Sequence, residues 1–150
     1  MVRSVSLPSL TLESVFVADF LAISRAPDQR YLEARWKRPV SGEEFRQGME
    51  IITESISEYM VELLLLDFRL TGTPSVSEQN WLVHYLASDN QVSQLRRSAR
   101  LFSKDLFQHI VNEVITEKMG WLPYEFCVFE CETLAKQWLF SGAETGYRKE

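Results

Sequence analysis

Cysteine is scarce in this sequence, which contains only two, Cys127 and Cys131. A secreted domain held together by disulfides would need more, so we expect a reducing, cytoplasmic setting. In one extended strand, steps of about 3.3 Å per residue would separate the two by roughly 13 Å, too far for a disulfide or a shared zinc ion. Only a strand that ends at Glu130 would bring them together. We therefore predict no metal site.

Long hydrophobic runs are also missing. No segment approaches the roughly 20 apolar residues of a membrane span. The apolar stretch VFVADFLAI at 15–23 is interrupted by Asp19 and has neither a basic flank nor a small-residue cleavage site. We therefore predict neither a membrane span nor a signal peptide.

Basic charge is in deficit, because the formal net charge is −5. Nucleic-acid-binding domains normally carry a dominant basic face, so we expect no nucleic-acid partner. The densest basic cluster is RRSAR, with Arg96, Arg97 and Arg100. We predict a solvated strand edge and turn there, and an anion-binding spot is the alternative.

Patterns typical of catalysis are absent as well. None of the six glycines falls in a GxGxxG or GxxxxGK phosphate-binding loop. His84 and His109 have no serine, cysteine or carboxylate at a spacing that indicates a catalytic triad. The sequence therefore favours a protein that is not an enzyme, and it predicts no cofactor.

The apolar content is sufficient for one core. The chain has 150 residues, of which 45% are hydrophobic, and both values are typical of one globular domain. We predict a single domain over 1–150, with an N-terminal arm at 1–12 and a frayed tail at 141–150.

Two strand-like runs open the domain, at 15–24 and 30–38, and a turn around Pro27 and Asp28 separates them. In the second run polar residues alternate with apolar ones, which is typical of a strand with one wetter face and one apolar face. The polar positions are Tyr31, Glu33, Arg35 and Lys37. An antiparallel hairpin is the expected opening.

A helix is predicted at 41–59, where Ser41 and Glu44 form a capping-box pair. Apolar residues recur on one stripe at helical spacing, and acidic residues mostly occupy the other side, which predicts a solvated face. The stripe consists of Phe45, Met49, Ile52, Ile56 and Tyr59. The run LLLLDF at 63–68 follows, and its continuous apolar character is typical of a strand buried on both faces.

The second half of the chain alternates helices with strands. Ser75 and Glu78 form a second capping-box pair, which predicts a helix from there. The other predicted segments are strands at 97–103 and 124–130 and helices at 104–118 and 131–140. Four residues of the last helix are expected to face inward: Leu134, Ala135, Trp138 and Leu139.

The predicted fold is therefore α/β, with the order β-β-α-β-α-β-α-β-α. An antiparallel hairpin opens a mixed sheet, parallel strands follow, and the helices pack on the sheet. The crossovers between parallel strands are expected to be right-handed.

Four stretches carry a likeness to a known family: ARWKRPVSGEEFRQG, ELLLLDFR, RSARLFS with the helix after it, and YEFCVFECETLAKQWL. In this order, over residues 14–140, they resemble the STAS domain. That fold occurs in bacterial anti-sigma-factor antagonists and in the cytoplasmic domains of sulphate transporters. The chain looks closest to the stand-alone STAS-like proteins of bacteria. The resemblance implies a non-enzymatic regulatory module that acts through protein–protein association.

The resemblance also draws attention to the loop after the central strand. In antagonist members an Asp-Ser-Ser-Gly-like motif begins the next helix, and phosphorylation of its serine switches partner association off. The corresponding stretch here, DFRLTGTPSVSEQNW, lacks that tetrapeptide. We predict that Ser75 caps the helix, and a phosphorylated Ser75 or Ser77 is the alternative.

Several polar residues are predicted near the carboxyl ends of the strands, where open α/β sheets usually bind ligands. They are Asp67, Arg69, Ser75, Ser77, Lys104, Asp105 and Glu132. The junction at 67–82 is the predicted contact surface for a protein partner. The alternative function is binding of a small or lipid-like ligand at the same edge. Trp121 follows a glycine outside the helical stripes, which predicts an exposed anchor for a partner or for self-association.

Overall fold

We describe the fold from a computed structural model of the chain. The structure describes residues 9–71, 75, 77, 78, 80, 81, 85, 94–104, 124–141 and 147–148. None of the helices in these ranges combines the length and the apolar character that crossing a membrane requires.

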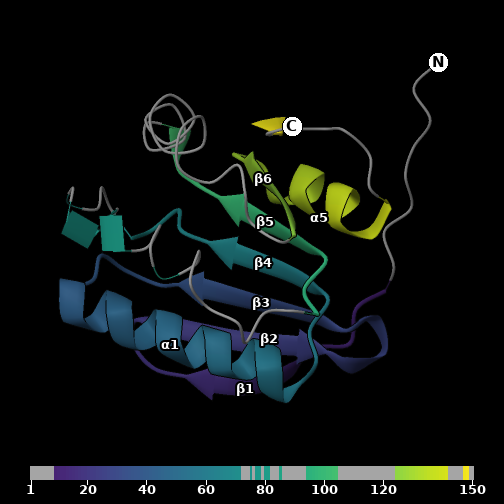
Figure 1. The fold of residues 1–150 in the computed structure, drawn as a ribbon, viewed down its shortest axis with the longest axis horizontal. Coiled ribbons are helices and arrows are strands. Elements are labelled where there is room, and N and C mark those ends of the chain that lie inside the picture. Colours follow the sequence, from purple (N-terminus) through teal and green to yellow (C-terminus); the bar gives the residue numbers. More distant parts are fainter. Residues whose placement is uncertain are drawn as a thin grey trace.

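The described strands form one seven-stranded sheet, in which they follow the same order as in the chain (Figure 1). The strands are β1 (Glu13–Val17), β2 (Leu21–Ala26), β3 (Tyr31–Trp36), β4 (Leu63–Asp67), β5 (Arg97–Leu101), β6 (Glu125–Phe129) and β7 (Tyr147–Arg148). Strands β1 to β3 pair antiparallel, β3 to β6 pair parallel, and β7 pairs antiparallel with β6. This arrangement confirms the predicted α/β class and mixed sheet.

The opening differs from the predicted hairpin, because the run 15–24 is not one strand. It contains most of β1 and β2, which are joined by a tight turn in which the Ala18 N–H donates to the Leu21 carbonyl at 2.9 Å. The predicted turn at Pro27 exists as a short 3-10 helix, η1 (Pro27–Gln29). Asp19 lies in the first turn, and its polarity marks a chain reversal inside an otherwise apolar run. The sheet therefore opens with three antiparallel strands.

Helix α1 (Gly42–Glu58) forms as predicted. Ser41 is its N-cap, and both bonds of the capping box with Glu44 are present. Four of the five predicted stripe residues are buried, and Tyr59 packs against the same core at its edge. The acidic residues of the other side are mostly exposed, so the predicted solvated face is confirmed.

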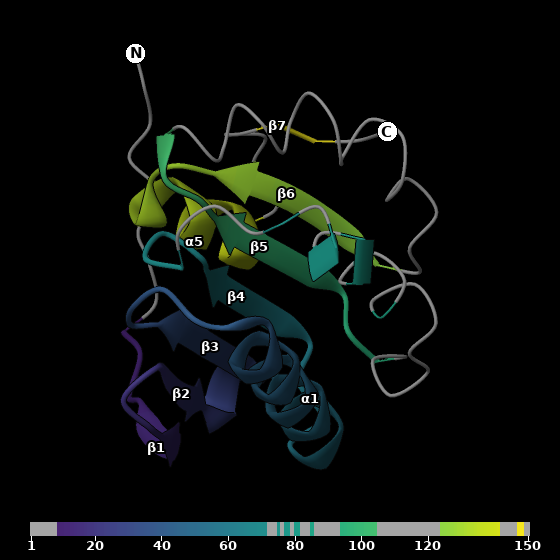
Figure 2. The same cartoon turned by 90° about the vertical axis from the view of Figure 1, so that its left-hand side faces the viewer.

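Helices cover both faces of the sheet. Figure 2 shows α1 on one face, and α5 (Glu132–Ser141) lies on the other, where it contacts β4, β5 and β6. Because side chains alternate along a strand, strands β2, β3, β4 and β6 contribute to both cores. The core under α1 includes Leu32, Ala34, Trp36, Leu64 and Leu66. The core under α5 includes Tyr31, Leu63, Leu65, Ala135 and Trp138.

Two predictions near the C-terminus are wrong. Leu134 of α5 is 39% exposed rather than inward, because the buried stripe of this short helix runs through Ala135, Trp138 and Leu139. The tail at 141–150 is not frayed throughout, since β7 adds to the outer side of β6. Backbone pairing with an open sheet edge supplies order that the polar composition did not indicate.

The prediction for the basic cluster holds only in part. Arg96 is exposed, but Arg100 is only 4% exposed, with its guanidinium 4.7 Å from the ring centroid of Phe126. Arg100 donates a 3.1 Å hydrogen bond to the hydroxyl of Tyr124. Strand alternation puts Arg100 on the α1 side of a central strand, so it does not lie at a solvated edge.

Gly48 marks the closest approach of α1 to the sheet. A Cβ atom there would lie 2.3 Å from Cη2 and 2.9 Å from Cζ3 of Trp36, a side chain that is 1% exposed. It would also lie 3.2 Å from a methyl carbon of Leu21. Only glycine lets the helix cross the sheet at this distance.

We expect Gly48→Ala to lower the free energy of unfolding by about 1–3 kcal/mol through overpacking. The clash outweighs the gain of about 1 kcal/mol that alanine brings to a helix interior. Urea unfolding followed by circular dichroism measures the change. Gln47→Ala, at the exposed neighbouring position, is the control and should stay within about 0.5 kcal/mol of the wild type. A Gly48→Ala protein as stable as the wild type would contradict the close packing.

Candidate functional site

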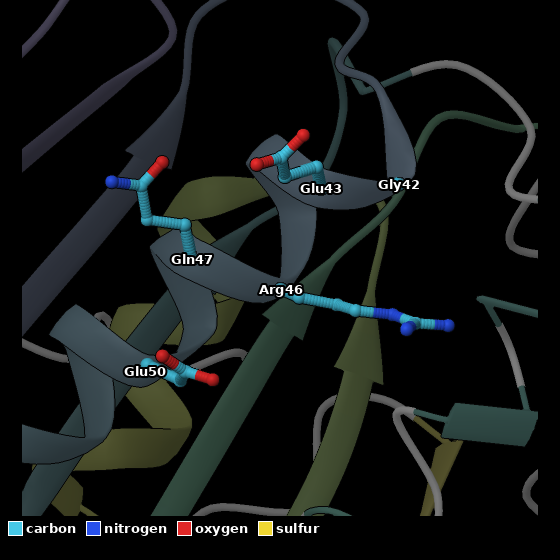
Figure 3. Close-up of a pocket in the computed structure, with 5 residues that line it drawn as sticks. All are labelled: Gly42, Glu43, Arg46, Gln47 and Glu50. Carbon is cyan, nitrogen blue, oxygen red and sulfur yellow. The ribbon is translucent and has the colours of Figure 1, made fainter.

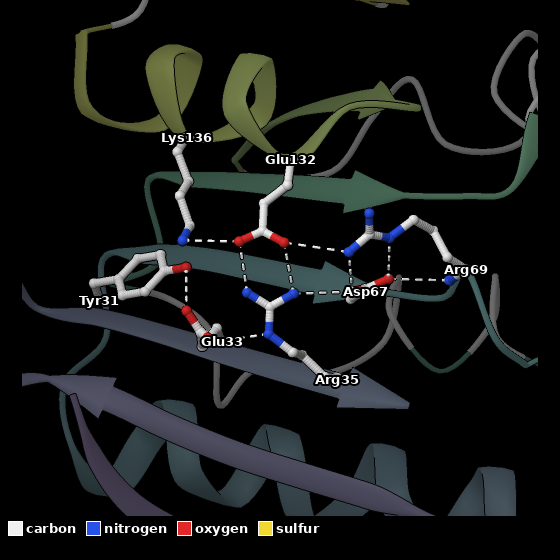
Figure 4. Close-up of polar contacts among 7 residues, drawn as sticks. All are labelled: Tyr31, Glu33, Arg35, Asp67, Arg69, Glu132 and Lys136. Carbon is white, nitrogen blue, oxygen red and sulfur yellow. Dashed lines mark hydrogen bonds and ion pairs between the residues drawn. The ribbon is translucent and has the colours of Figure 1, made fainter. Parts of the chain in front are cut away.

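A network of polar side chains lies on the α5 side of the sheet, toward the carboxyl ends of β3 and β4. The alternation of β3 points Tyr31, Glu33 and Arg35 to this side, as their spacing predicted. Asp67, the last residue of β4, pairs in register with Arg35. Figure 4 shows Arg35 between Glu33 and Asp67 and reaching Glu132 at the beginning of α5.

Arg35 is the centre of the network. Its two terminal nitrogens donate to the two carboxylate oxygens of Glu132, at 2.8 and 2.7 Å. Its Nε donates to Glu33 at 2.9 Å, and a terminal nitrogen donates to Asp67 at 3.0 Å. One guanidinium therefore joins β3, β4 and α5, and its paired contact with Glu132 has the two-bond geometry that makes such pairs strong.

Two further cations complete the network. Arg69 donates to both oxygens of Asp67, at 2.9 and 2.7 Å, and to Glu132 at 3.2 Å. Lys136, one helical turn after Glu132, lies 2.9 Å from its carboxylate. The backbone N–H of Arg69 also donates to Asp67 at 3.1 Å, which fixes the turn after β4.

The charges of the network balance. The cations Arg35, Arg69 and Lys136 face the carboxylates Glu33, Asp67 and Glu132. Glu33 and Asp67 are 5% and 6% exposed, so they depend on these partners for compensation. Tyr31 adds a neutral contact, because its hydroxyl donates to Glu33 at 2.9 Å.

Contacts within the network keep Glu132 and Asp67 ionised at neutral pH. Hydrogen bonds from Arg35 lower the pKa of Glu132 to about 2 in spite of partial burial. Burial is the largest influence on Asp67 and opposes ionisation, but the bonds from Arg69 outweigh it and lower the pKa of Asp67. The bonds to Glu132 raise the pKa of Arg35 further above its usual range. Burial raises the pKa of Tyr31, which therefore stays protonated.

Several residues of the predicted site meet in this network, and others lie elsewhere. Asp67, Arg69 and Glu132 come together. Ser75 accepts a hydrogen bond from the Glu78 N–H at 3.1 Å, so its predicted capping role is confirmed. The remaining members divide into exposed residues, Ser77 and Lys104, and residues outside the described part of the chain, Asp105 and Trp121.

The prediction did not include four members of the network. Tyr31, Glu33 and Arg35 were identified only as the wetter face of a strand, and Lys136 was not singled out. The alternation on β3 was the available signal. It shows that these side chains share a face, but not that α5 covers that face.

An open hollow of about 470 Å³ lies along α1. The described residues that line it are Gly42, Glu43, Arg46, Gln47 and Glu50. Figure 3 shows their side chains spread apart along one helix, without a common centre. Small-molecule sites bring a few polar groups together in a largely apolar pocket, so this hollow does not favour a ligand-binding function.

Neither cysteine takes part in the network. Both lie in the described part of the chain, where Cys127 is buried and Cys131 is exposed. Strand β6 ends at Phe129, so Cys131 lies outside the strand, but no disulfide joins the two cysteines. Among the described residues, no group of three or more His, Cys, Asp or Glu side chains is placed to hold a metal ion.

We expect Arg35→Met to lower the free energy of unfolding by about 3 kcal/mol at pH 7. Breaking a buried ion pair usually costs about 3–5 kcal/mol. We take the low end of this range because 30% of the Arg35 side chain is exposed. The pKa of Glu132 is lowered from its ordinary value of 4.5, so its ionised form stabilises the fold fully above pH 4.5. This stabilisation is lost as the pH falls from 4.5 toward about 2. The difference in the free energy of unfolding between Arg35→Met and the wild type should therefore become smaller as the pH falls through that interval. Urea unfolding at a series of pH values measures it.

Arg38→Met is the matched control, because Arg38 follows the same strand and pairs with Asp19 and Glu44 at the surface. Arg38→Met should lower the free energy of unfolding much less than Arg35→Met, since exposed ion pairs are screened by solvent. Equal losses in the two variants, or an Arg35→Met effect that does not change with pH, would contradict the central role of Arg35.

Comparisons with known proteins give no match: no family model, no curated protein and no solved structure matches the chain. The resemblance to the STAS domain therefore stays a prediction, and the function is inferred from the geometry of the chain itself.

Proposed function

We propose that this chain is a non-enzymatic interaction module of the STAS-like type, which works in the bacterial cytoplasm through protein–protein association. The proposed contact surface is the carboxyl rim, defined here as Arg69, Leu70 and Glu132. Arg69 and Leu70 lie at the junction that follows β4, within the predicted partner surface at 67–82, and Glu132 of α5 contacts Arg69.

The observation that carries the proposal is the exposure of Leu70 on a fixed turn. Leu70 is 58% exposed, although it lies between two residues whose backbones are held in place. The Arg69 N–H donates to the side chain of Asp67, and the N–H and hydroxyl of Thr71 donate to the Phe68 carbonyl at 3.2 and 2.8 Å. An apolar side chain on such a turn loses little conformational freedom when a partner buries it.

The charges around Leu70 also favour association. Arg69 and Glu132 retain 37% and 29% side-chain exposure, so a partner can reach them. They are already paired with each other, which leaves no unpaired charge to be buried under the partner. An apolar contact with satisfied polar groups at its rim is common in protein–protein interfaces.

The same pairing supports a non-enzymatic function. A general acid or base needs a pKa near the working pH. Asp67 and Glu132 are instead held ionised by the cations that they contact. These carboxylates are suited to holding α5 against the sheet, which keeps the carboxyl rim in one conformation.

We expect Leu70→Glu to abolish partner binding without unfolding the protein. Affinity capture from cells of the source organism, with quantitative mass spectrometry, would compare wild type, Leu70→Glu and Met60→Glu. Met60 is the matched control, because it is 55% exposed and precedes β4 at the opposite end of that strand. Proteins that bind the carboxyl rim should be recovered with wild type and with Met60→Glu, and lost with Leu70→Glu.

Thermal unfolding of the three proteins separates binding from folding, since surface substitutions of this kind usually change stability by no more than about 0.5 kcal/mol. Recovery of the same proteins with Leu70→Glu as with wild type would reject the carboxyl rim as the contact surface. Recovery of nothing above a tag-only control would reject protein association under those conditions.

A further inference from the structure

The outer strand β1 is a second surface, away from the carboxyl rim. It forms one edge of the sheet, and β2 is its neighbour on the inner side. Val17, at its end, is 67% exposed, and Leu12, just before it, is 43% exposed. The sequence of β1, ESVFV, contains neither lysine nor proline, which often protect such edges, and its one charged residue, Glu13, forms an ion pair with Arg25. An edge with these properties is suited to accept another strand.

A bulge in β1 shapes the surface beside this edge. The pairing with β2 shifts between Ser14 and Phe16, so Val15 is an extra residue. Val15 and Phe16 consequently both pack against the core under α1, which strict alternation would forbid. Together with Ile51 and Tyr59 of the α1 region, they line a groove of about 250 Å³.

The groove combines an apolar floor with acidic walls. Glu54 and Glu58 line it, one helical turn apart, and both are exposed. Arg25 lies 4.2 Å from the ring centroid of Tyr59, but it forms an ion pair with Glu13 of β1. Because Glu13 and Arg25 compensate each other, the described residues that line the groove contribute two negative charges, those of Glu54 and Glu58. The groove therefore favours a cationic partner.

Two other occupants fit less well. Small-molecule pockets usually measure about 300–1,000 Å³, and a groove of about 250 Å³ is better suited to single side chains. A second copy of the chain, paired antiparallel through β1, would keep both α1 helices on one face of the joined sheet. The acidic walls formed by Glu54 and Glu58 would then face each other, and like charges would oppose the pairing.

We propose that β1 and this groove bind an extended, lysine- or arginine-containing segment of a partner protein, which adds to the sheet as an eighth strand. Side chains on one side of that segment would lie over the groove. The aliphatic stem of a lysine or arginine covers Val15, Phe16 and Tyr59, and its charged end reaches Glu54 or Glu58. This inference goes beyond the proposed function, because it concerns a different surface from the carboxyl rim.

The experiment uses a synthetic peptide, acetyl-KVKVKVK-amide, as the probe, with the full chain labelled for NMR. We expect saturable shifts of the backbone amides in β1 and next to the groove in α1. Two further peptides are controls: acetyl-EVEVEVE-amide reverses the charge, and acetyl-KKKKVVV-amide keeps the composition but loses the alternation. Both controls should bind at least about tenfold more weakly, since they lose the ion pairs or the strand pattern.

The double variant Glu54→Lys/Glu58→Lys should weaken binding of the alternating peptide by about tenfold or more, because two ion pairs become repulsive contacts. Glu43→Lys/Glu50→Lys is the matched control, with the same charge change on the same helix but outside the groove. It should retain affinity to within about threefold. Leu70→Glu should bind the peptide like the wild type, so the two proposals can fail separately.

Three results would overturn the inference. Equal weakening by the two double variants would show only general attraction to an acidic protein. Shifts in α1 without shifts in the β1 amides would exclude strand addition. A dimer of the wild type in sedimentation, disrupted by Val17→Lys, would show that a second copy occupies the edge.

Discussion

The guanidinium of Arg35 is the contact on which the polar side of the sheet depends. Glu33 and Asp67 are buried on adjacent strands, and both point toward α5. Without a cation between them, two carboxylates in this position would carry a large desolvation cost. Glu132 completes the arrangement, because it is the first residue of α5, where the helix dipole favours a negative charge. The beginning of α5 is therefore fixed by the same side chain that balances Arg35.

The two faces of the sheet are stabilised in different ways. On the α1 side, Trp36, Phe45, Phe68 and Phe102 form successive ring contacts, with stacked centroids 5.3 Å apart for Trp36 and Phe45 and 5.1 Å apart for Phe68 and Phe102. Gly48 allows α1 to approach these rings closely. On the α5 side the apolar core gives way to ion pairs toward the carboxyl ends of β3 and β4. Apolar packing holds α1 against the sheet, while α5 also depends on oriented charges.

The sequence allowed local features to be predicted better than long-range ones. The capping boxes and the stripe of α1 follow from spacings of a few residues, and the structure confirms them. The polar residues of β3 do share one side, but the prediction that this side is wetter is wrong, because Tyr31 and Glu33 are buried. The pair between Arg35 and Glu132 spans 97 residues and requires both the strand order and the placement of α5. The same limit explains the error at Arg100. Its burial follows from the neighbours that β4 and β6 provide, whereas a cluster of arginines in a sequence resembles a solvated edge.

The two surfaces proposed for partners would draw on different forces. At the carboxyl rim the charges are already paired, so a partner gains mainly by burying Leu70, and such binding responds weakly to salt. At the β1 edge the excess acidic charge would attract a basic segment from a distance, and ions screen this attraction over about 10 Å at 0.1 M salt. The edge alone would also offer backbone groups, which add affinity without regard to side-chain identity. Partner selection at the rim would therefore depend on shape, and selection at the edge on charge and on the capacity to form a strand.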